Sequence, residues 1–271
     1  MPQRRTQLQS TPAFTVERVD SFVPVCRTSQ WSPVYQVASC RFILPHSGLT
    51  EFRWGDSFAL LDGISVLCLP TGLPYQMQQF HSGLGEATSN IVISLPADSA
   101  ATVSQPRTVA LNARAQWQLR RHWRELALRN QSEPSTAVRH ILDLTLPLPL
   151  TSGSLSSARC IHSVKRDIAR RVASLDAPRW TLHDVADSAG LSPFYLARIF
   201  KAHTGMTLHG YRQQLRLTMA LQCLQGSKPH CQVNLADLAA GLGYSSQSHM
   251  GFAFQRELGV TPAQARLELA G

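Results

Sequence analysis

The stretch Thr181–His203 leaves the fewest structural choices open in this chain of 271 residues. Apolar residues repeat at helical spacing in its first part, and Gly190 then stands where the end of a helix favours a left-handed residue. Ser192 follows as a helix N-cap, and Pro193 takes the first helical position, where its missing N–H is harmless. The pattern therefore predicts two short helices joined by a tight turn.

The second of these helices separates into two faces. The residues expected to face a core are Leu196, Ile199, Phe200 and His203. The residues on the opposite side are Phe194, Ala197, Arg198 and Lys201. An arginine, a lysine and an aromatic side chain on the outer face indicate a helix-turn-helix with a recognition helix.

The same pattern occurs a second time, with one extra residue in the turn. The second copy has its apolar positions at Leu235, Leu238 and Ala239, its turn glycine at Gly243 and its N-cap at Ser246. Residues 207–225 lie between the copies and read as a helix with apolar residues on more than one face, so we expect a buried strut. A strut of about 17 residues spans about 25 Å. That length suits two units set roughly one DNA turn, 34 Å, apart.

Composition is consistent with a polyanionic partner. The formal net charge is +9 and the pI about 9.7, a balance that fits nucleic acid without proving it. The six cysteines are scattered and lack zinc-binding spacing, so we expect buried thiols in a reducing cytoplasm, with a redox pair as the alternative. No apolar run reaches the roughly 18–20 residues of a membrane span, and the N-terminus has no signal-peptide pattern. A cytoplasmic protein with no membrane partner is expected.

The first half of the chain is different in character. Residues 1–20 read as a loose polar arm, and short β-type runs then follow from Ser21 to about Pro96, which favours a small barrel or sandwich. Residues 113–130 and 134–146 have helical patterns, and we expect their arginines to lie over an apolar surface rather than on phosphate. Residues 146–157, rich first in proline and then in serine, read as a linker.

Metal chemistry finds no support in the sequence. The chain has no H-x-H motif, which a metal cupin needs together with a carboxylate. His46 and His81 are isolated, and we expect them to be loop or surface residues rather than ligands. The expected metal and cofactor content is therefore none.

The second half resembles the DNA-binding domain of the AraC/XylS family. The motifs that carry the resemblance are L-x-x-V-A from Leu182, S-x-x-x-L-x-x-x-F-K from Ser192, G-Y-x-x-Q-S-H from Gly243 and G-V-T-P from Gly259. Residues Ala59–Tyr75 resemble the cupin-like sensor domain of the same family. The resemblance implies an α+β chain: a cupin-like β-barrel sensor domain with a helical dimerisation segment, followed by an all-α domain. The implied ranges are 1–150 for sensing and dimerisation, 151–160 for a linker and 161–271 for DNA binding, with helix-turn-helix units at about 182–203 and 235–258.

The resemblance also implies a function. It predicts an effector-responsive transcriptional activator that binds a double-stranded DNA operator as a homodimer, senses a small molecule and contacts RNA polymerase. A repressor of the same family is the first alternative, and a cupin-type metalloenzyme is the second. The implied base-reading residues of the first motif are Phe194, Ala197 and Arg198, with Lys201 near a phosphate. Those of the second motif are Gln247, Ser248, Gly251 and Phe252.

Two departures from the family weaken the second motif. The family usually has arginine where Phe252 stands and lysine where Gln255 stands, so this outward face is expected to carry no charge. Phe252 either contacts a thymine methyl group or packs within the protein, and Gln247 either pairs with adenine or caps the turn. Arg198 either reads guanine in a bidentate contact or touches only phosphate.

Overall fold

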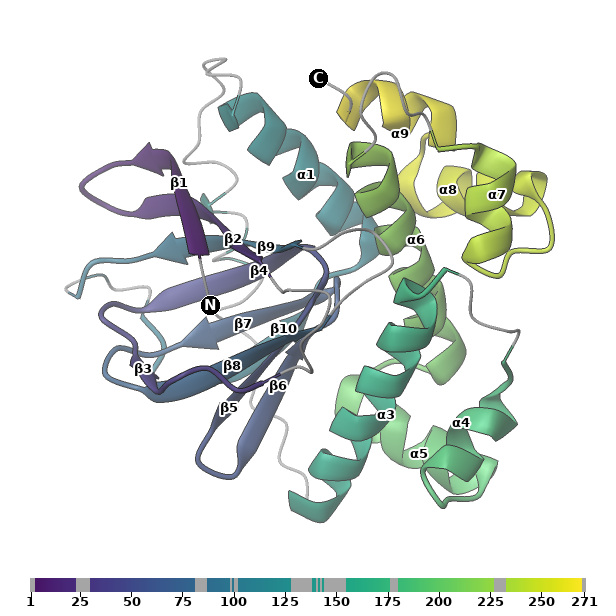
Figure 1. The fold of residues 1–271 in the computed structure, drawn as a ribbon, viewed down its shortest axis with the longest axis horizontal. Helices are drawn as coiled ribbons and strands as arrows, with labels where there is room; N and C mark the ends of the chain where they lie inside the picture. The colour runs from purple at the N-terminus through teal and green to yellow at the C-terminus, as the bar shows by residue number, and fades with distance from the viewer. Residues whose placement is uncertain are drawn as a thin grey trace. The chain divides into compact units, whose positions relative to one another are not determined.

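The computed structural model describes residues 3–22, 30–80, 87–97, 99, 102–127, 138–139, 141, 143, 155–175, 180–226 and 233–269. The chain divides into two compact units, and the division falls after Leu150 (Figure 1). The first unit holds the strands, and the second holds the C-terminal helices together with the short segment Asn112–Trp117. This is the α+β organisation expected from the sequence, with β-strands first and helices second.

The first unit is built from antiparallel strands in two sheets. The strands are β1 (Gln3–Ser10), β2 (Thr15–Phe22), β3 (Tyr35–Gln36), β4 (Arg41–Ser47), β5 (Leu49–Trp54), β6 (Ser57–Leu61), β7 (Ser65–Leu69), β8 (Pro74–Phe80), β9 (Ala87–Ser94) and β10 (Arg107–Ala110). The sheets run in the orders β1-β2-β9-β4-β7-β10 and β3-β8-β5-β6. Both sheets contribute to one apolar core, which includes Val19, Ile43, Phe52, Met77 and Val92.

The N-terminal residues form a hairpin rather than the loose arm expected from the sequence. β1 pairs with β2 in antiparallel register from Gln3 opposite Ser21 to Ser10 opposite Thr15. β1 is the edge strand of its sheet, and most of its side chains are exposed. Its backbone hydrogen bonds with β2 hold it, so its side chains, apart from Leu8, can be polar. A polar edge strand lacks the apolar alternation by which a strand is recognised in a sequence.

His46 lies in β4 and is buried, so the expectation of a loop or surface position was wrong. Almost all of β4 is buried on both faces, and this depends on strand stacking that the sequence does not reveal. Desolvation by burial is the main reason that the pKa of His46 lies well below its ordinary value. Arg120 is also buried and donates from Nη2 to the His46 carbonyl oxygen over 2.6 Å. His81 lies outside the described residues.

The helices are α1 (Ala113–Ala127), α3 (Leu155–Ala173), α4 (Leu182–Ser188), α5 (Pro193–Thr204), α6 (Leu208–Gly226), α7 (Leu235–Gly241), α8 (Gln247–Leu258) and α9 (Pro262–Leu269). α3 begins at Leu155, inside the stretch 151–160 that the sequence assigns to a linker. Within the second unit, α6 lies between α4–α5 and α7–α8 (Figure 1). Tyr211, Leu217, Leu221 and Leu224 of α6 are fully buried, which confirms the expected central strut.

Of the cysteines, Cys40, Cys68 and Cys223 are buried, Cys160 is half-buried, and none of these four is in a disulfide. Burial raises the pKa of Cys68 to about 12. Cys26 and Cys231 lie outside the described residues. No helix in the described ranges is long and apolar enough to cross a membrane. Across the same ranges, no three His, Cys, Asp or Glu side chains come together in a way that could hold a metal ion.

Candidate nucleic-acid interface

The two helix-turn-helix units close their turns with the same hydrogen bond. In the first turn, the N–H of Leu191 donates to the carbonyl of Ala186 over 3.0 Å, and in the second that of Tyr244 donates to Ala239 over 2.9 Å. The residues just before these donors are left-handed glycines, Gly190 with φ 64° and Gly243 with φ 77°. A residue without a Cβ adopts this conformation at no steric cost. The duplication read from the sequence is therefore a duplication of structure.

The recognition helices α5 and α8 also begin and end alike. Ser192 Oγ accepts from the Tyr195 N–H over 3.3 Å, and Ser246 Oγ accepts from the His249 N–H over 3.1 Å. Each helix ends on a left-handed glycine, Gly205 or Gly259. Because both N-cap hydroxyl groups accept from the N–H three residues further on, positions counted from Ser192 and from Ser246 can be compared directly.

The outward face of α5 carries the four residues predicted for it. Phe194 is 92% exposed, and Ala197, Arg198 and Lys201 are exposed beside it. On the opposite side of the helix, Leu196 and Phe200 are fully buried and fix the orientation of α5. The sequence prediction omitted Tyr195, which is 41% exposed and lies under the Arg198 guanidinium, with Cζ 5.3 Å from the ring centroid. A cation over an aromatic face at this distance is a favourable contact.

The outward face of α8 carries a charge that the sequence prediction omitted. Phe252 is 65% exposed, Gln247 and Ser248 are exposed, and Gly251 is half-buried. Arg256 lies beside Phe252, with its Cζ atom 5.9 Å from the ring centroid. The expectation of an uncharged face was therefore incomplete. The i, i+4 spacing of the two residues is visible in the sequence, but Arg256 falls outside the positions that the two copies share.

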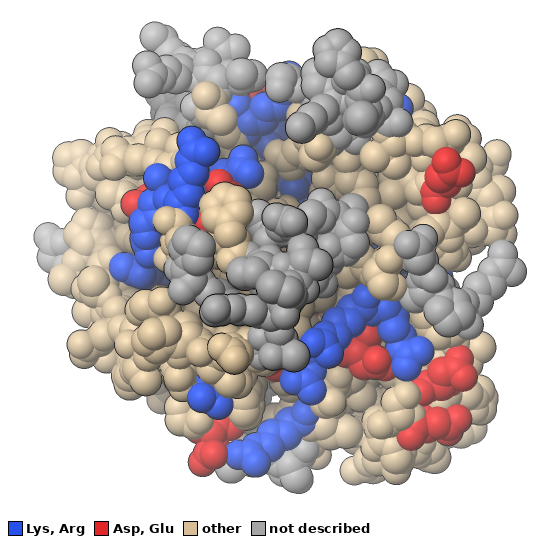
Figure 2. Space-filling model, viewed as in Figure 1, with Lys and Arg blue, Asp and Glu red and all other residues tan. Residues whose placement is uncertain are grey.

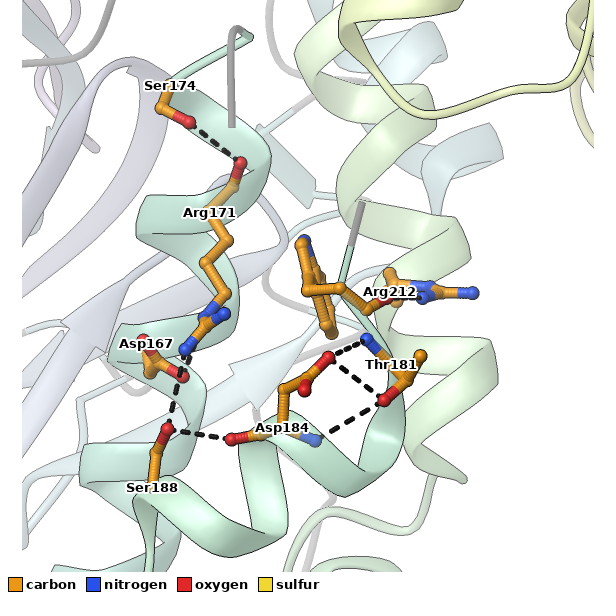
Figure 3. A network of polar contacts seen from close by, with 8 residues as sticks. Asp167, Arg171, Ser174, Thr181, Asp184, Ser188 and Arg212 are labelled. Atoms are coloured by element: carbon orange, nitrogen blue, oxygen red, sulfur yellow. Dashed lines mark hydrogen bonds and ion pairs between the residues drawn. The ribbon is translucent and has the colours of Figure 1, made fainter. Parts of the chain in front are cut away.

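The first helix-turn-helix unit contacts its neighbouring helices through Trp180. The guanidinium groups of Arg171 on α3 and Arg212 on α6 both lie over the Trp180 ring, at 5.8 Å and 5.0 Å from its centroid. Arg212 also donates from Nη1 to the Trp180 carbonyl over 3.4 Å. Figure 3 shows Arg171 linked to Asp167 on its own helix and to Ser188 on α4. These contacts join α3, α4 and α6 beside the first helix-turn-helix unit.

A capping box begins α4 at the same place (Figure 3). The Asp184 N–H donates to Thr181 Oγ1 over 3.4 Å, and the Thr181 N–H donates to the Asp184 carboxylate over 2.5 Å. The backbone N–H of Thr181 is the main reason that the pKa of Asp184 is lowered. Two helix-end donors are thus satisfied within four residues.

The second helix-turn-helix unit contacts α6 in a corresponding way. Arg216 lies over the ring of Tyr244, with Cζ 5.5 Å from the centroid, and Gln213 donates to the Tyr244 hydroxyl over 3.3 Å. Burial raises the pKa of Tyr244 to about 12 and lowers that of Arg216. α6 therefore contacts one aromatic residue beside each helix-turn-helix unit: Arg212 contacts Trp180, and Arg216 contacts Tyr244.

A basic band crosses the region of α3. Figure 2 shows Lys and Arg side chains gathered over this helix, with acidic residues close to one side. The basic residues of α3 are Arg159, Lys165, Arg166, Arg170 and Arg171. Among their contacts, Arg171 lies over the ring of Trp180, and Lys165 lies 5.6 Å from the ring centroid of Tyr211. The band adds positive potential to the helical unit.

Comparison with known proteins agrees with this geometry. Residues 185–268 match the family model described as "Helix-turn-helix domain". The HTH-type transcriptional activator RhaR of Escherichia coli (strain K12) is 32% identical over 116 residues, which is 43% of this chain and 39% of RhaR. The match therefore spans well under half of the length of RhaR.

Two solved structures match the chain at low sequence identity. ToxT from Vibrio cholerae O395 is 10% identical and covers 96% of this chain and 100% of its own, with a TM-score of 0.36. The C-terminal domain of AraT, a response regulator from Geobacillus stearothermophilus, is 24% identical and covers 41% and 87%, with a TM-score of 0.36. Both TM-scores are below 0.5, so no residue role is carried over from either protein.

Two capped, duplicated units with exposed recognition helices on a shared buried strut define a DNA-binding domain of the helix-turn-helix class. The family-model match lies in this domain. The chain is similar to the HTH-type transcriptional activator RhaR, and the resemblance to the AraC/XylS DNA-binding domain rests on residues of this domain.

Proposed function

We propose that the chain is a sequence-specific regulator that binds double-stranded DNA in the cytoplasm and activates transcription when a small-molecule effector binds its first unit. The observation that carries the DNA-binding part is the pair of exposed recognition-helix faces on α5 and α8, each fixed by a buried opposite face. Recognition helices of this kind enter the major groove with their exposed residues toward the base edges. Repression by the same DNA contacts is the alternative.

We propose distinct roles for the outward residues. Arg198 is placed to read guanine, because its neighbours Leu196 and Phe200 turn it outward from a rigid core. Lys201, one turn further along α5, contributes a phosphate contact. On α8, Gln247 and Ser248 occupy the exposed N-terminal turn, and Gly251 lets the backbone approach the groove closely. Ala197 offers a small apolar contact on α5.

Genome-wide mapping of the sites bound by the full-length chain tests this proposal. We expect discrete sites that share a sequence pattern covering two neighbouring major grooves. Uniform occupancy with no shared pattern would contradict it. A reporter driven by the strongest site then separates activation from repression, since the two alternatives predict changes of opposite sign. Sedimentation equilibrium tests the homodimer that the family resemblance implies, and a stoichiometric metal in the purified protein would support the metalloenzyme alternative instead.

Buried polar groups in the first unit support the effector part of the proposal. Gln79 on β8 is fully buried, and neither of its amide atoms has a hydrogen-bond partner in the described parts of the chain. The same is true of the hydroxyl groups of Ser21 and Thr88, which stand directly opposite each other on β2 and β9. Thr50 pairs opposite Gln79 and accepts from the Asn90 amide over 3.4 Å, which links the two sheets.

Such groups are costly when nothing satisfies them, and a bound polar molecule would satisfy them. We therefore propose that this cluster (Ser21, Thr50, Gln79, Thr88 and Asn90) contacts an uncharged effector with hydrogen-bonding groups. The substitution Gln79→Met, which keeps the volume, should raise the Tm of the free protein and abolish the Tm increase caused by an active compound from a metabolite panel. A lowered Tm with the response retained would mean that Gln79 only supports the fold.

A further inference from the structure

The two recognition helices carry the same exposed pair of side chains, but at different distances from their N-caps. On α5 the pair is Phe194 and Arg198, and on α8 it is Phe252 and Arg256. In each pair an exposed phenylalanine precedes an arginine by four residues, so both side chains lie on one face of the helix. Phe194 and Phe252 are 92% and 65% exposed.

The pair on α8 stands one helical turn further from the N-cap. Phe194 lies two residues after Ser192, whereas Phe252 lies six residues after Ser246. Four residues advance the chain by about 6 Å along the axis and turn it by only about 40°. The pair on α8 therefore faces outward as the pair on α5 does, and it differs mainly in its position along the helix axis. At the position equivalent to Phe194, α8 has the small residue Ser248.

The chemistry of the pair fits a particular step of bases. A phenyl ring makes an apolar contact with the C5-methyl group of thymine, and a guanidinium group binds guanine through O6 and N7. The Arg256 side chain is 56% exposed and lies over the Phe252 ring, which orients it without burying its donors. Its ion pair with Glu257, at 2.8 Å, is solvent-exposed, and exchanging such a pair for a base contact costs little.

We propose that Phe252 and Arg256 determine the specificity of the second half of the operator, where they read a thymine and a neighbouring guanine from the middle of α8. The first helix-turn-helix unit reads its bases with Phe194 and Arg198, which lie at the beginning of α5. α8 must then lie further along its groove than α5 does. This assignment rests on the proposed function, and it gives Arg256 a role in base recognition that does not follow from the duplicated positions.

The experiment uses full-length protein and a random double-stranded DNA library. Recovery of a consensus that spans two grooves establishes the operator, and failure to recover one counts against the proposed function itself. In the recovered operator, each thymine is then replaced in turn by deoxyuridine, which lacks only the C5-methyl group. Each guanine is replaced by 7-deazaguanine, which lacks the N7 acceptor.

In the second half of the operator, we expect one thymine whose replacement weakens binding about fourfold, the value of one methyl group removed from water. We expect one neighbouring guanine whose replacement weakens it about tenfold. The first effect should vanish in Phe252→Ala and the second in Arg256→Ala. Leu267→Ala is the control, because Leu267 is 75% exposed and belongs to α9 rather than to either recognition helix. It should keep both effects.

Two results would overturn the assignment. One is that the deoxyuridine effect in the second half is as large in Phe252→Ala as in the unaltered protein. The other is that Arg256→Ala weakens binding equally on every sequence and lowers the salt slope by about one, which is the signature of a phosphate contact. Both side chains are exposed, so these variants are expected to fold, and unchanged circular dichroism verifies this.

Discussion

Arg216 and Gly243 meet so closely that no side chain fits between them. A Cβ atom added to Gly243 would lie 2.6 Å from the Nη2 atom of Arg216. Arg216 is held there by the ring of Tyr244, so it cannot easily move away. The turn of the second helix-turn-helix unit is thus packed directly against the central helix α6. Gly190, the equivalent residue of the first unit, has open space around its Cβ position.

This difference predicts unequal effects of one substitution at two equivalent sites. Gly190→Ala should cost about 1–2 kcal/mol of unfolding free energy, because only the left-handed backbone opposes it. Gly243→Ala should cost more, because the methyl group also displaces the Arg216 guanidinium. Urea unfolding of both variants makes the comparison. Equal losses would show that Arg216 gives way freely and that its contact with Tyr244 contributes little.

Arg198→Ala should abolish most operator specificity. A bidentate guanine contact gives about 1–3 kcal/mol of base discrimination, so we expect affinity for the operator to fall by about 10- to 100-fold, while binding to unrelated DNA changes little. Phe252→Ala should have a smaller effect. Titration of labelled operator and random DNA measures both. The reverse order of the two variants would make α8 and not α5 the dominant reader.

Lys201→Ala should act differently from Arg198→Ala, because an exposed lysine contacts phosphate as a point charge. Binding to operator and to random DNA should weaken by the same factor. The slope of log affinity against log salt should become shallower by about one. Affinity measured at four or five salt concentrations provides the test. A loss confined to the operator would instead place Lys201 on a base.

The buried His46 predicts a pH dependence for the stability of the first unit. Burial keeps the pKa of His46 in the folded state well below 6.5, its value in an unfolded chain. Above pH 6.5, His46 is neutral in both the folded and the unfolded chain, so the unfolding free energy has its full value. Below it, only the unfolded chain takes up the proton, so the unfolding free energy falls by at most about 1.4 kcal/mol per pH unit. Urea titrations at pH 7.5 and 5.5 should show this loss, and His46→Gln should reduce it. An identical loss in both proteins would assign it to other groups.

The helical unit was predictable in detail because its signals are local. A cap, a glycine turn and a periodic apolar face lie within about twenty residues, and the second copy repeats them, so Ser192, Gly190 and Phe200 all have their expected roles. The outward positions follow from the inward ones by geometry alone. Arg256 escaped this reasoning because it stands where the first copy has Ala202, and a repeat draws attention only to matching positions.

The β unit was less predictable because its structure depends on contacts between distant strands. β1 is polar and β4 is buried on both faces, and neither has a regular alternation. The burial of His46 requires both sheets and α1 to be in place, since the Arg120 side chain covers its carbonyl. The Gln79 cluster is likewise visible only when β2, β5, β8 and β9 are assembled. Register between strands far apart in the chain cannot be derived from local periodicity.

The position of Trp180 provides the helical unit with an optical reporter of its own. It is the one tryptophan among the five in the sequence that comes after residue 150, and two guanidinium groups lie over its indole ring. Replacing the other four by phenylalanine would leave a fluorophore whose emission reports opening of the first helix-turn-helix unit alone. The second unit has Tyr244 in the corresponding contact with α6 and would remain dark when tryptophan is excited selectively.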